Sequence, residues 1–99
     1  MGTTIHFKIL KYGNKVWWDQ AATRLNVFHD RYFSGTEPMR SISDYKKGWT
    51  FVKTYAEQPY HDKVKNMLKN AARHGFVIKI HDELDGEERI FRRRNLGRG

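Results

Sequence analysis

The sequence predicts an α+β fold in which two helices pack on one face of a single, mainly antiparallel sheet. Three observations lead to this prediction. Segments with alternating apolar residues and segments with apolar residues at three- and four-residue steps follow one another in the order β-α-β-α-β-β. The chain has 99 residues, the size of one domain, and neither a linker nor an internal repeat divides it. We therefore expect residues 1–99 to form one domain, with residues 95–99 as a frayed tail.

The first third of the chain carries one strand and one helix. Residues 3–12 alternate apolar and polar side chains, which is typical of a half-buried strand. After a Gly-Asn turn, residues 15–18 form either a short returning strand or the start of a helix. Residues 19–33 place apolar side chains at helical spacing, with Asp19 expected at the N-cap or in the first turn and Gly35 as the stop.

The middle of the chain adds a long connection, a strand and a second helix. Residues 34–48 have weak periodicity, and we expect a functional or mobile loop with a short helical turn at residues 43–47. Residues 49–55 are rich in aromatic and β-branched types and predict a strand. Residues 59–74 predict an amphipathic helix that ends at Gly75 in a left-handed conformation.

The last two strands are predicted to form a hairpin. Residues 76–82 alternate apolar side chains, and residues 89–94 form the returning strand. The Asp-Gly dipeptide at residues 85–86 indicates a two-residue turn. A hairpin centred there sets Ile80 opposite Phe91. The order of the strands in the sheet stays open.

Charge is distributed unevenly along the chain. The net charge is +8, and five of the eleven acidic residues lie within residues 82–88. The rest of the chain carries 19 basic against 6 acidic residues, an excess of +13. Such an excess attracts polyanions, nucleic acid above all.

Composition also excludes several classes of protein. The chain has no cysteine, which removes disulfides, thiolate zinc sites and cysteine nucleophiles. It contains no long apolar run and no signal peptide at its N-terminus. We expect a cytoplasmic or nuclear protein without membrane contact, cofactor or metal.

Basic and aromatic residues supply the candidate nucleic-acid site. A run of arginines lies near the end of the chain: Arg89, Arg92, Arg93, Arg94 and Arg98. We expect these side chains to bind phosphates bidentately, or alternatively to protect an edge strand by their charge. The second helix carries a basic ridge, formed by Lys65, Lys69 and Arg73 at four-residue steps. We expect this ridge to contact phosphate, or alternatively to be an ordinary solvated face. We expect most of the aromatic set to be buried in the core: Trp17, Trp18, Trp49, Phe51, Tyr55 and Tyr60. Trp17 and Trp18 are adjacent and cannot both point inward on a strand, so one of them is a candidate for base stacking. The candidate residues are Arg92, Arg93, Arg94, Lys65, Lys69, Arg73 and Trp17.

These features favour a small nucleic-acid-binding accessory protein without enzymatic activity, for DNA or RNA. One alternative is a protein-binding modulator or inhibitor of a nucleic-acid enzyme, with residues 34–48 and exposed aromatics as the interface. A second is a metal-independent ribonuclease, because histidines and cations around a phosphate suffice for general acid-base catalysis. Its candidate residues are His61, Lys65, His81 and Arg92. Pairing of an edge strand with a second copy also stays open.

Overall fold

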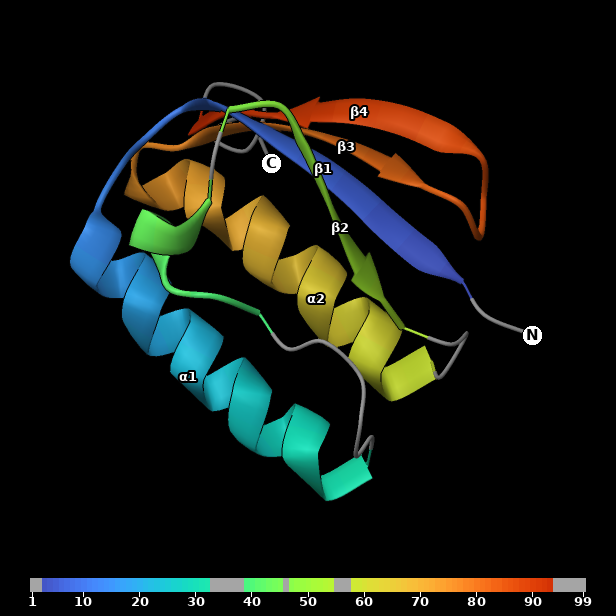
Figure 1. Ribbon diagram of the computed structural model, residues 1–99. Helices are drawn as coiled ribbons and strands as arrows, with labels where there is room; N and C mark the ends of the chain where they lie inside the picture. Colours follow the sequence, from blue (N-terminus) through green and yellow to red (C-terminus); the bar gives the residue numbers. More distant parts are fainter. Residues whose placement is uncertain (1–2, 33–38, 46, 55–57, 94–99) are drawn as a thin grey trace.

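Four antiparallel strands form one sheet, and both long helices lie on the same face of it (Figure 1). The computed structural model describes residues 3–32, 39–45, 47–54 and 58–93. It confirms the predicted α+β class and element order. The elements are β1 (Thr4–Lys11), α1 (Lys15–Tyr32), the 3₁₀ turn η1 (Ile42–Asp44), β2 (Trp49–Lys53), α2 (Gln58–Ala71), the 3₁₀ turn η2 (Ala72–His74), β3 (Val77–Asp82) and β4 (Glu87–Phe91).

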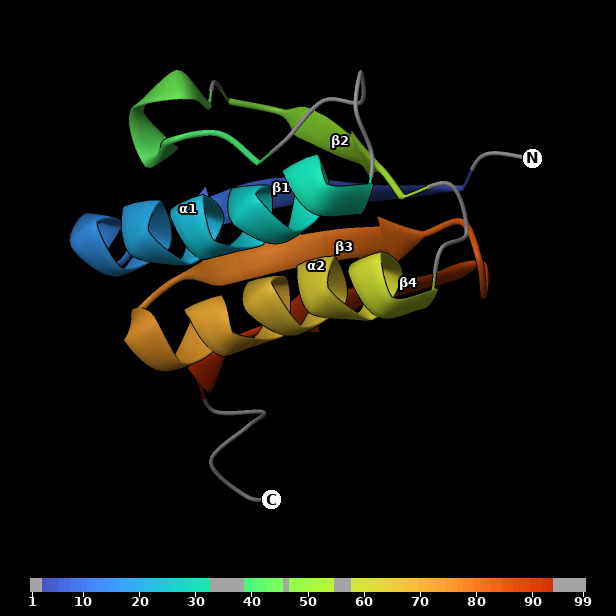
Figure 2. The ribbon, with the colours of Figure 1, turned by 90° about the horizontal axis from the view of Figure 1, so that it is seen from below.

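The strand order is β2-β1-β3-β4, so β1 and β3 are central and β2 and β4 are the edges. β1 pairs with β2 on one side and β3 on the other. In Figure 2, α1 and α2 run side by side in front of the strands. The opposite face of the sheet is covered by neither helix, and we call it the open face.

Alternation along the strands divides the side chains between the two faces. Ile5 and Phe7 point toward the helices and are fully buried, whereas His6 and Lys8 lie on the open face and are half-buried. The helices add Trp18 and other apolar side chains to this core. The largest fully buried apolar side chains are Trp18, Tyr60, Phe7, Phe76, Ile5, Met39, Leu68, Ile78, Ile80 and Val64.

α1 begins four residues before its predicted start, so residues 15–18 belong to the helix and not to a strand. The Trp17 amide donates a hydrogen bond of 3.0 Å to Oδ1 of Asn14, which makes Asn14 the N-cap. The expectation that Asp19 caps this helix was therefore wrong. Gly35, the predicted stop, lies outside the described residues.

Asp19 caps a different element. Its Oδ1 accepts hydrogen bonds from the Ile42 amide at 2.8 Å and from Oγ of Ser41 at 3.0 Å. These bonds tie η1, which is the predicted short helical turn, to the side of α1. Met39, Ile42 and Tyr45 are buried in the core. The described part of the long connection is thus packed against the protein and offers these apolar side chains to no partner.

The second helix ends as predicted. α2 continues into the 3₁₀ turn Ala72–His74, and Gly75 follows with φ 92° in the left-handed region. The Phe76 amide donates back to the Ala71 carbonyl oxygen at 3.1 Å, which satisfies a terminal carbonyl of the helix.

The turn after β1 packs directly on this helix end. The Asn14 amide donates to the carbonyl oxygen of His74 at 2.8 Å. A Cβ atom on Gly13 would lie 2.2 Å from that same oxygen. Only glycine allows this close approach of the two backbones.

The β3–β4 hairpin differs from the prediction in register. Ile80 lies opposite Arg89 and not Phe91, and Phe91 lies opposite Ile78. The predicted pairing was therefore wrong by two positions. Because side chains alternate with a period of two, the shift leaves every residue on its expected face. The connection is the four-residue segment 83–86 in place of a two-residue turn.

Two aspartates stabilise the longer connection. Oδ1 of Asp82 accepts from the Leu84 amide at 2.9 Å, and Oδ1 of Asp85 accepts from the Glu87 amide at 2.8 Å. The Gly86 amide donates to the Asp82 carbonyl oxygen at 2.8 Å, and Gly86 takes φ 72°. In a two-residue Asp-Gly turn the amides of residues 84 and 87 would pair with the opposite strand. Here the two aspartate side chains accept hydrogen bonds from these amides instead.

Candidate functional site

The basic ridge of α2 is only partly available to a ligand. Nζ of Lys65 lies 2.8 Å from Asp82 and 3.1 Å from Asp85. The hydrogen bond to Asp82 raises the pKa of Lys65, and burial opposes this. Lys69 and Arg73 are exposed and have no acidic partner in the described part of the chain. Lys65 is therefore occupied by the protein itself, and the other two are free to bind an anion.

The last strand is displaced from its predicted range: β4 spans Glu87–Phe91, so the expectation that it carries the arginines after residue 91 was wrong. Arg92 and Arg93 directly follow Phe91 and are exposed. α2 contacts β4, so the helix and this edge strand are neighbours in the fold. Arg94 lies outside the described residues.

The two adjacent tryptophans of α1 have different surroundings. Trp18 is fully buried and donates its indole N–H to the Arg40 carbonyl oxygen at 3.1 Å. Trp17 is half-buried and stacks on His74, with ring centroids 4.4 Å apart and an interplanar angle of 13°. Trp17, the candidate for stacking, is thus already stacked on one side by the protein.

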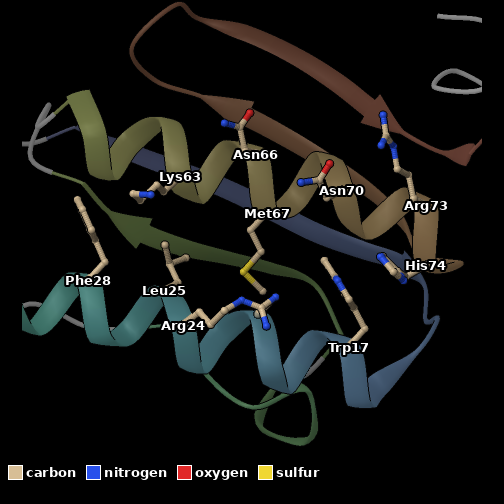
Figure 3. Close-up of a pocket in the computed structure, with 11 residues that line it drawn as sticks. Trp17, Arg24, Leu25, Phe28, Lys63, Asn66, Met67, Asn70, Arg73 and His74 are labelled. Atoms are coloured by element: carbon tan, nitrogen blue, oxygen red, sulfur yellow. The ribbon is translucent and has the colours of Figure 1, made fainter.

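A groove with a volume of about 590 Å³ runs between α1 and α2 (Figure 3). The Trp17–His74 stack closes one end, and Phe28 and Lys63 lie at the other. Lys63 places its Nζ 5.0 Å from the centre of the Phe28 ring. None of the eleven lining residues is acidic: Trp17, Ala21, Arg24, Leu25, Phe28, Lys63, Asn66, Met67, Asn70, Arg73 and His74.

The open face presents aromatic and basic side chains in two aligned rows across the sheet. Cross-strand pairing sets the order within each row, because directly opposed residues lie on the same face. The first row is Phe51–His6–His81–Glu88, and the second is Trp49–Lys8–Lys79–Ile90. Each row runs from β2 to β4 and begins with an aromatic ring.

Both aromatic rings at the β2 edge are accessible to solvent. Trp49 and Phe51 are each 48% exposed. The His6 ring lies 6.4 Å from Phe51 and 5.8 Å from His81, between centroids. A shallow hollow of about 340 Å³ is lined by His6, Trp49, His81 and Glu88. Large exposed aromatics on an uncovered sheet face are unusual unless they contact a partner.

The charges on this face are mainly positive. Lys8 and Lys53 have no carboxylate partner within the described ranges. Lys79 lies 2.8 Å from Glu88 and holds the pKa of that carboxyl below its usual value. Nε2 of His6 lies 2.6 Å from Glu83 at the rim. The face therefore combines stacking surfaces with two free ammonium groups.

The sequence predicts that most of the aromatic set lies in the core. Trp18 and Tyr60 do, Trp17 is half-buried, and Tyr55 lies outside the described residues, but Trp49 and Phe51 are exposed. Trp49 and Phe51 are two positions apart in β2, on the face opposite Val52. The alternation Trp-Thr-Phe-Val carries the signal that both rings share one face. Knowing that this face is uncovered required the position of the helices.

A buried polar network lies on the other side of the sheet. His61 places Nδ1 2.8 Å from Oγ1 of Thr54 and Nε2 3.0 Å from Oδ2 of Asp82. An ionised carboxylate only accepts, so Nε2 of His61 donates to Asp82. The Thr54 hydroxyl donates to the Thr3 carbonyl oxygen at 3.4 Å. Lys65 completes the network at 2.8 Å from Asp82.

This network offers no catalytic base to a substrate. His61 and Asp82 are each 1% exposed and Thr54 is fully buried. His81, the other histidine considered for a ribonuclease, lies on the open face beside His6. Of the residues considered for that reaction, His61 and Lys65 meet at Asp82, whereas His81 lies on the opposite face of the sheet.

Across the described ranges, no three histidine, aspartate or glutamate side chains are placed to hold a metal ion. No helix in these ranges is long and apolar enough to cross a membrane. The chain matches no protein-family model, and comparison with curated proteins and with solved structures found no significant similarity.

Proposed function

We propose that this protein binds single-stranded nucleic acid on the open face of its sheet. The supporting observation is that half-exposed Trp49 and Phe51 share a sheet face that no described element covers with Lys8 and Lys53, whose ammonium groups have no carboxylate partner in the described ranges. Aromatic rings beside free cations bind single strands, because every base has a stacking face and every nucleotide a phosphate. The proposal keeps the nucleic-acid partner expected from composition and assigns the main contact to a different surface.

The spacing of the two rings favours a single strand over a duplex. Alternate residues on a strand are separated by about 7 Å. Stacked bases rise only about 3.4 Å per nucleotide. Neighbouring bases must therefore separate before each can stack on its own ring at Trp49 or Phe51. A single strand can do this without breaking base pairs, and a duplex cannot.

The experiment is a titration of labelled single-stranded DNA, single-stranded RNA and duplex DNA, followed by fluorescence anisotropy at about 50 and 200 mM salt. Base–aromatic stacking contributes about 1–3 kcal/mol per base. Trp49→Ala and Phe51→Ala are each expected to weaken single-strand binding by roughly 5- to 150-fold. Leu84→Ala is the matched control, because Leu84 is 50% exposed in the β3–β4 connection and belongs to neither row of the open face.

Two outcomes would contradict the proposal. One is the absence of binding to any single strand at the lower salt. The other is equal binding by Trp49→Ala, Leu84→Ala and the unmodified protein, which would mean that the rings do not contact the bases. Duplex binding as tight as single-strand binding would contradict the spacing argument.

A protein partner is the second candidate, because tryptophan and phenylalanine beside a hollow of about 340 Å³ also suit a protein interface. Such an interface depends mainly on apolar contact at Trp49 and Phe51. Its affinity therefore changes little between the two salt concentrations, whereas phosphate contacts weaken about tenfold or more.

A further inference from the structure

We infer that the groove between α1 and α2 is a binding site for the phosphate groups of a small polyphosphate ligand. This site goes beyond the proposed function, because the groove lies on the helix side of the sheet and shares no lining residue with the open face. The argument rests on the charge, the hydrogen-bond donors and the shape of the groove.

The charge of the groove is wholly positive among its lining residues. Arg24 from α1 and Lys63 and Arg73 from the α2 side line it, and no carboxylate does. Arg24 and Arg73 have no acidic partner in the residues that the structure describes. A polyanion in the groove is attracted to these cations, and no lining carboxylate opposes it. Guanidinium groups suit phosphate because their planar fork donates two hydrogen bonds at once.

Two amide side chains add neutral donors. Asn66 and Asn70 lie one turn apart on α2, are exposed, and make no hydrogen bond to another described residue. Each carries two N–H donors that suit phosphate oxygens.

The ends and floor of the groove give it a defined shape. Leu25, Met67 and Ala21 are buried and form its apolar floor. In Figure 3 Arg24 and Met67 lie between the helices, while the Trp17–His74 stack and Phe28 mark the two ends. Along α1 these ends are about 16 Å apart at 1.5 Å per residue. A volume of about 590 Å³ lies within the range of sites for small ligands.

The same phosphate chemistry comes from inorganic polyphosphate or from a nucleotide. The test therefore titrates the protein with tripolyphosphate and, separately, with ATP, both without metal ions, by calorimetry. Chemical shifts of the Trp17 indole and of the Asn66 and Asn70 amides report where the ligand binds. Tighter binding of ATP assigns a nucleotide, because its base adds contacts, and equal binding assigns the inorganic chain.

Arg24→Gln and Arg73→Gln are each expected to weaken tripolyphosphate binding about tenfold, since each removes hydrogen bonds to a charged group. The matched control is Lys53→Gln, which removes one charge from the open face and should leave this binding within about twofold. All three residues are exposed, so the variants fold.

An equal loss in Lys53→Gln would overturn the inference, because the attraction would then be that of the net charge. Unchanged Trp17 and amide signals on titration would overturn it as well. Trp49→Ala is expected to bind tripolyphosphate like the unmodified protein. Failure of the single-strand proposal and failure of this one are thus separate results.

Discussion

Asn in place of Asp82 tests whether the buried polar network stabilises the fold. The Asp82 carboxyl accepts hydrogen bonds from Lys65 at 2.8 Å, His61 at 3.0 Å and the Leu84 amide at 2.9 Å. Losing one partner of a buried ion pair typically costs about 3–5 kcal/mol. Lys65 is partly exposed and keeps Asp85 as a partner, and asparagine keeps the bond to Leu84. We therefore expect a loss of roughly 2–3 kcal/mol.

Urea unfolding followed by tryptophan fluorescence measures this loss, since Trp18 is fully buried in the core. For a domain of this size the loss corresponds to about 10–20 °C in Tm. Asp85→Asn is the control, because it removes only the exposed partner of Lys65 and should leave the midpoint nearly unchanged. A loss below about 1 kcal/mol in Asp82→Asn would refute the view that this network stabilises the protein.

The same carboxylate predicts how stability responds to acid. Burial alone would raise the pKa of Asp82, but the hydrogen bonds from Lys65, His61 and the Leu84 amide together hold it below its usual value of 3.8. A carboxyl with a depressed pKa stabilises the folded state above its ordinary pKa and loses that contribution as the pH falls through the depressed value. We expect Asp82→Asn to reduce the dependence of stability on pH below 3.8.

Substitutions at three further positions test the fold. Gly13→Ala should lower stability by about 2 kcal/mol or more, because its Cβ would lie 2.2 Å from the His74 carbonyl oxygen; an unchanged thermal midpoint would contradict that close approach. Asn14→Ala removes the N-cap of α1 and should cost about 1 kcal/mol in urea unfolding, whereas Asn14→Asp should cost much less. Burial raises the pKa of Tyr45 to about 12, and hydrogen bonding to the Arg40 amide opposes this. Stability should fall as the pH rises from 10 toward 12, and Tyr45→Phe should weaken that trend.

Local patterns in the sequence were enough to predict the type and order of the elements. Each helix and strand carries its own apolar periodicity, and the Gly75 stop depends only on neighbouring residues. The N-cap of α1 was misassigned because Asn14 and Asp19 both suit that role locally. Only the packing of η1 against α1 shows that Asp19 is engaged elsewhere.

The candidate site was less predictable because it depends on contacts between distant segments. The sequence alone suggests that Lys65 is a free cation. The fold places Asp82 of β3 beside it. The sequence alone suggests that Trp49 and Phe51 belong to the core. The structure shows both helices on the opposite face of the sheet, which leaves the two rings exposed. Trp17 and Arg73, in contrast, were selected from the sequence and do line one groove.

The central position of β1 has a consequence for how the chain folds. β1 pairs with β3 through residues about 70 positions away, such as Ile9 with Ile78 and Ile5 with Asp82. Loops of this length must close before the pairing contributes any free energy, which slows folding relative to a helical bundle of the same size. Until β3 joins, β1 exposes an unpaired backbone edge that invites aggregation. We therefore expect the yield of refolded protein to fall as the protein concentration rises, because aggregation competes with the pairing of β1 and β3.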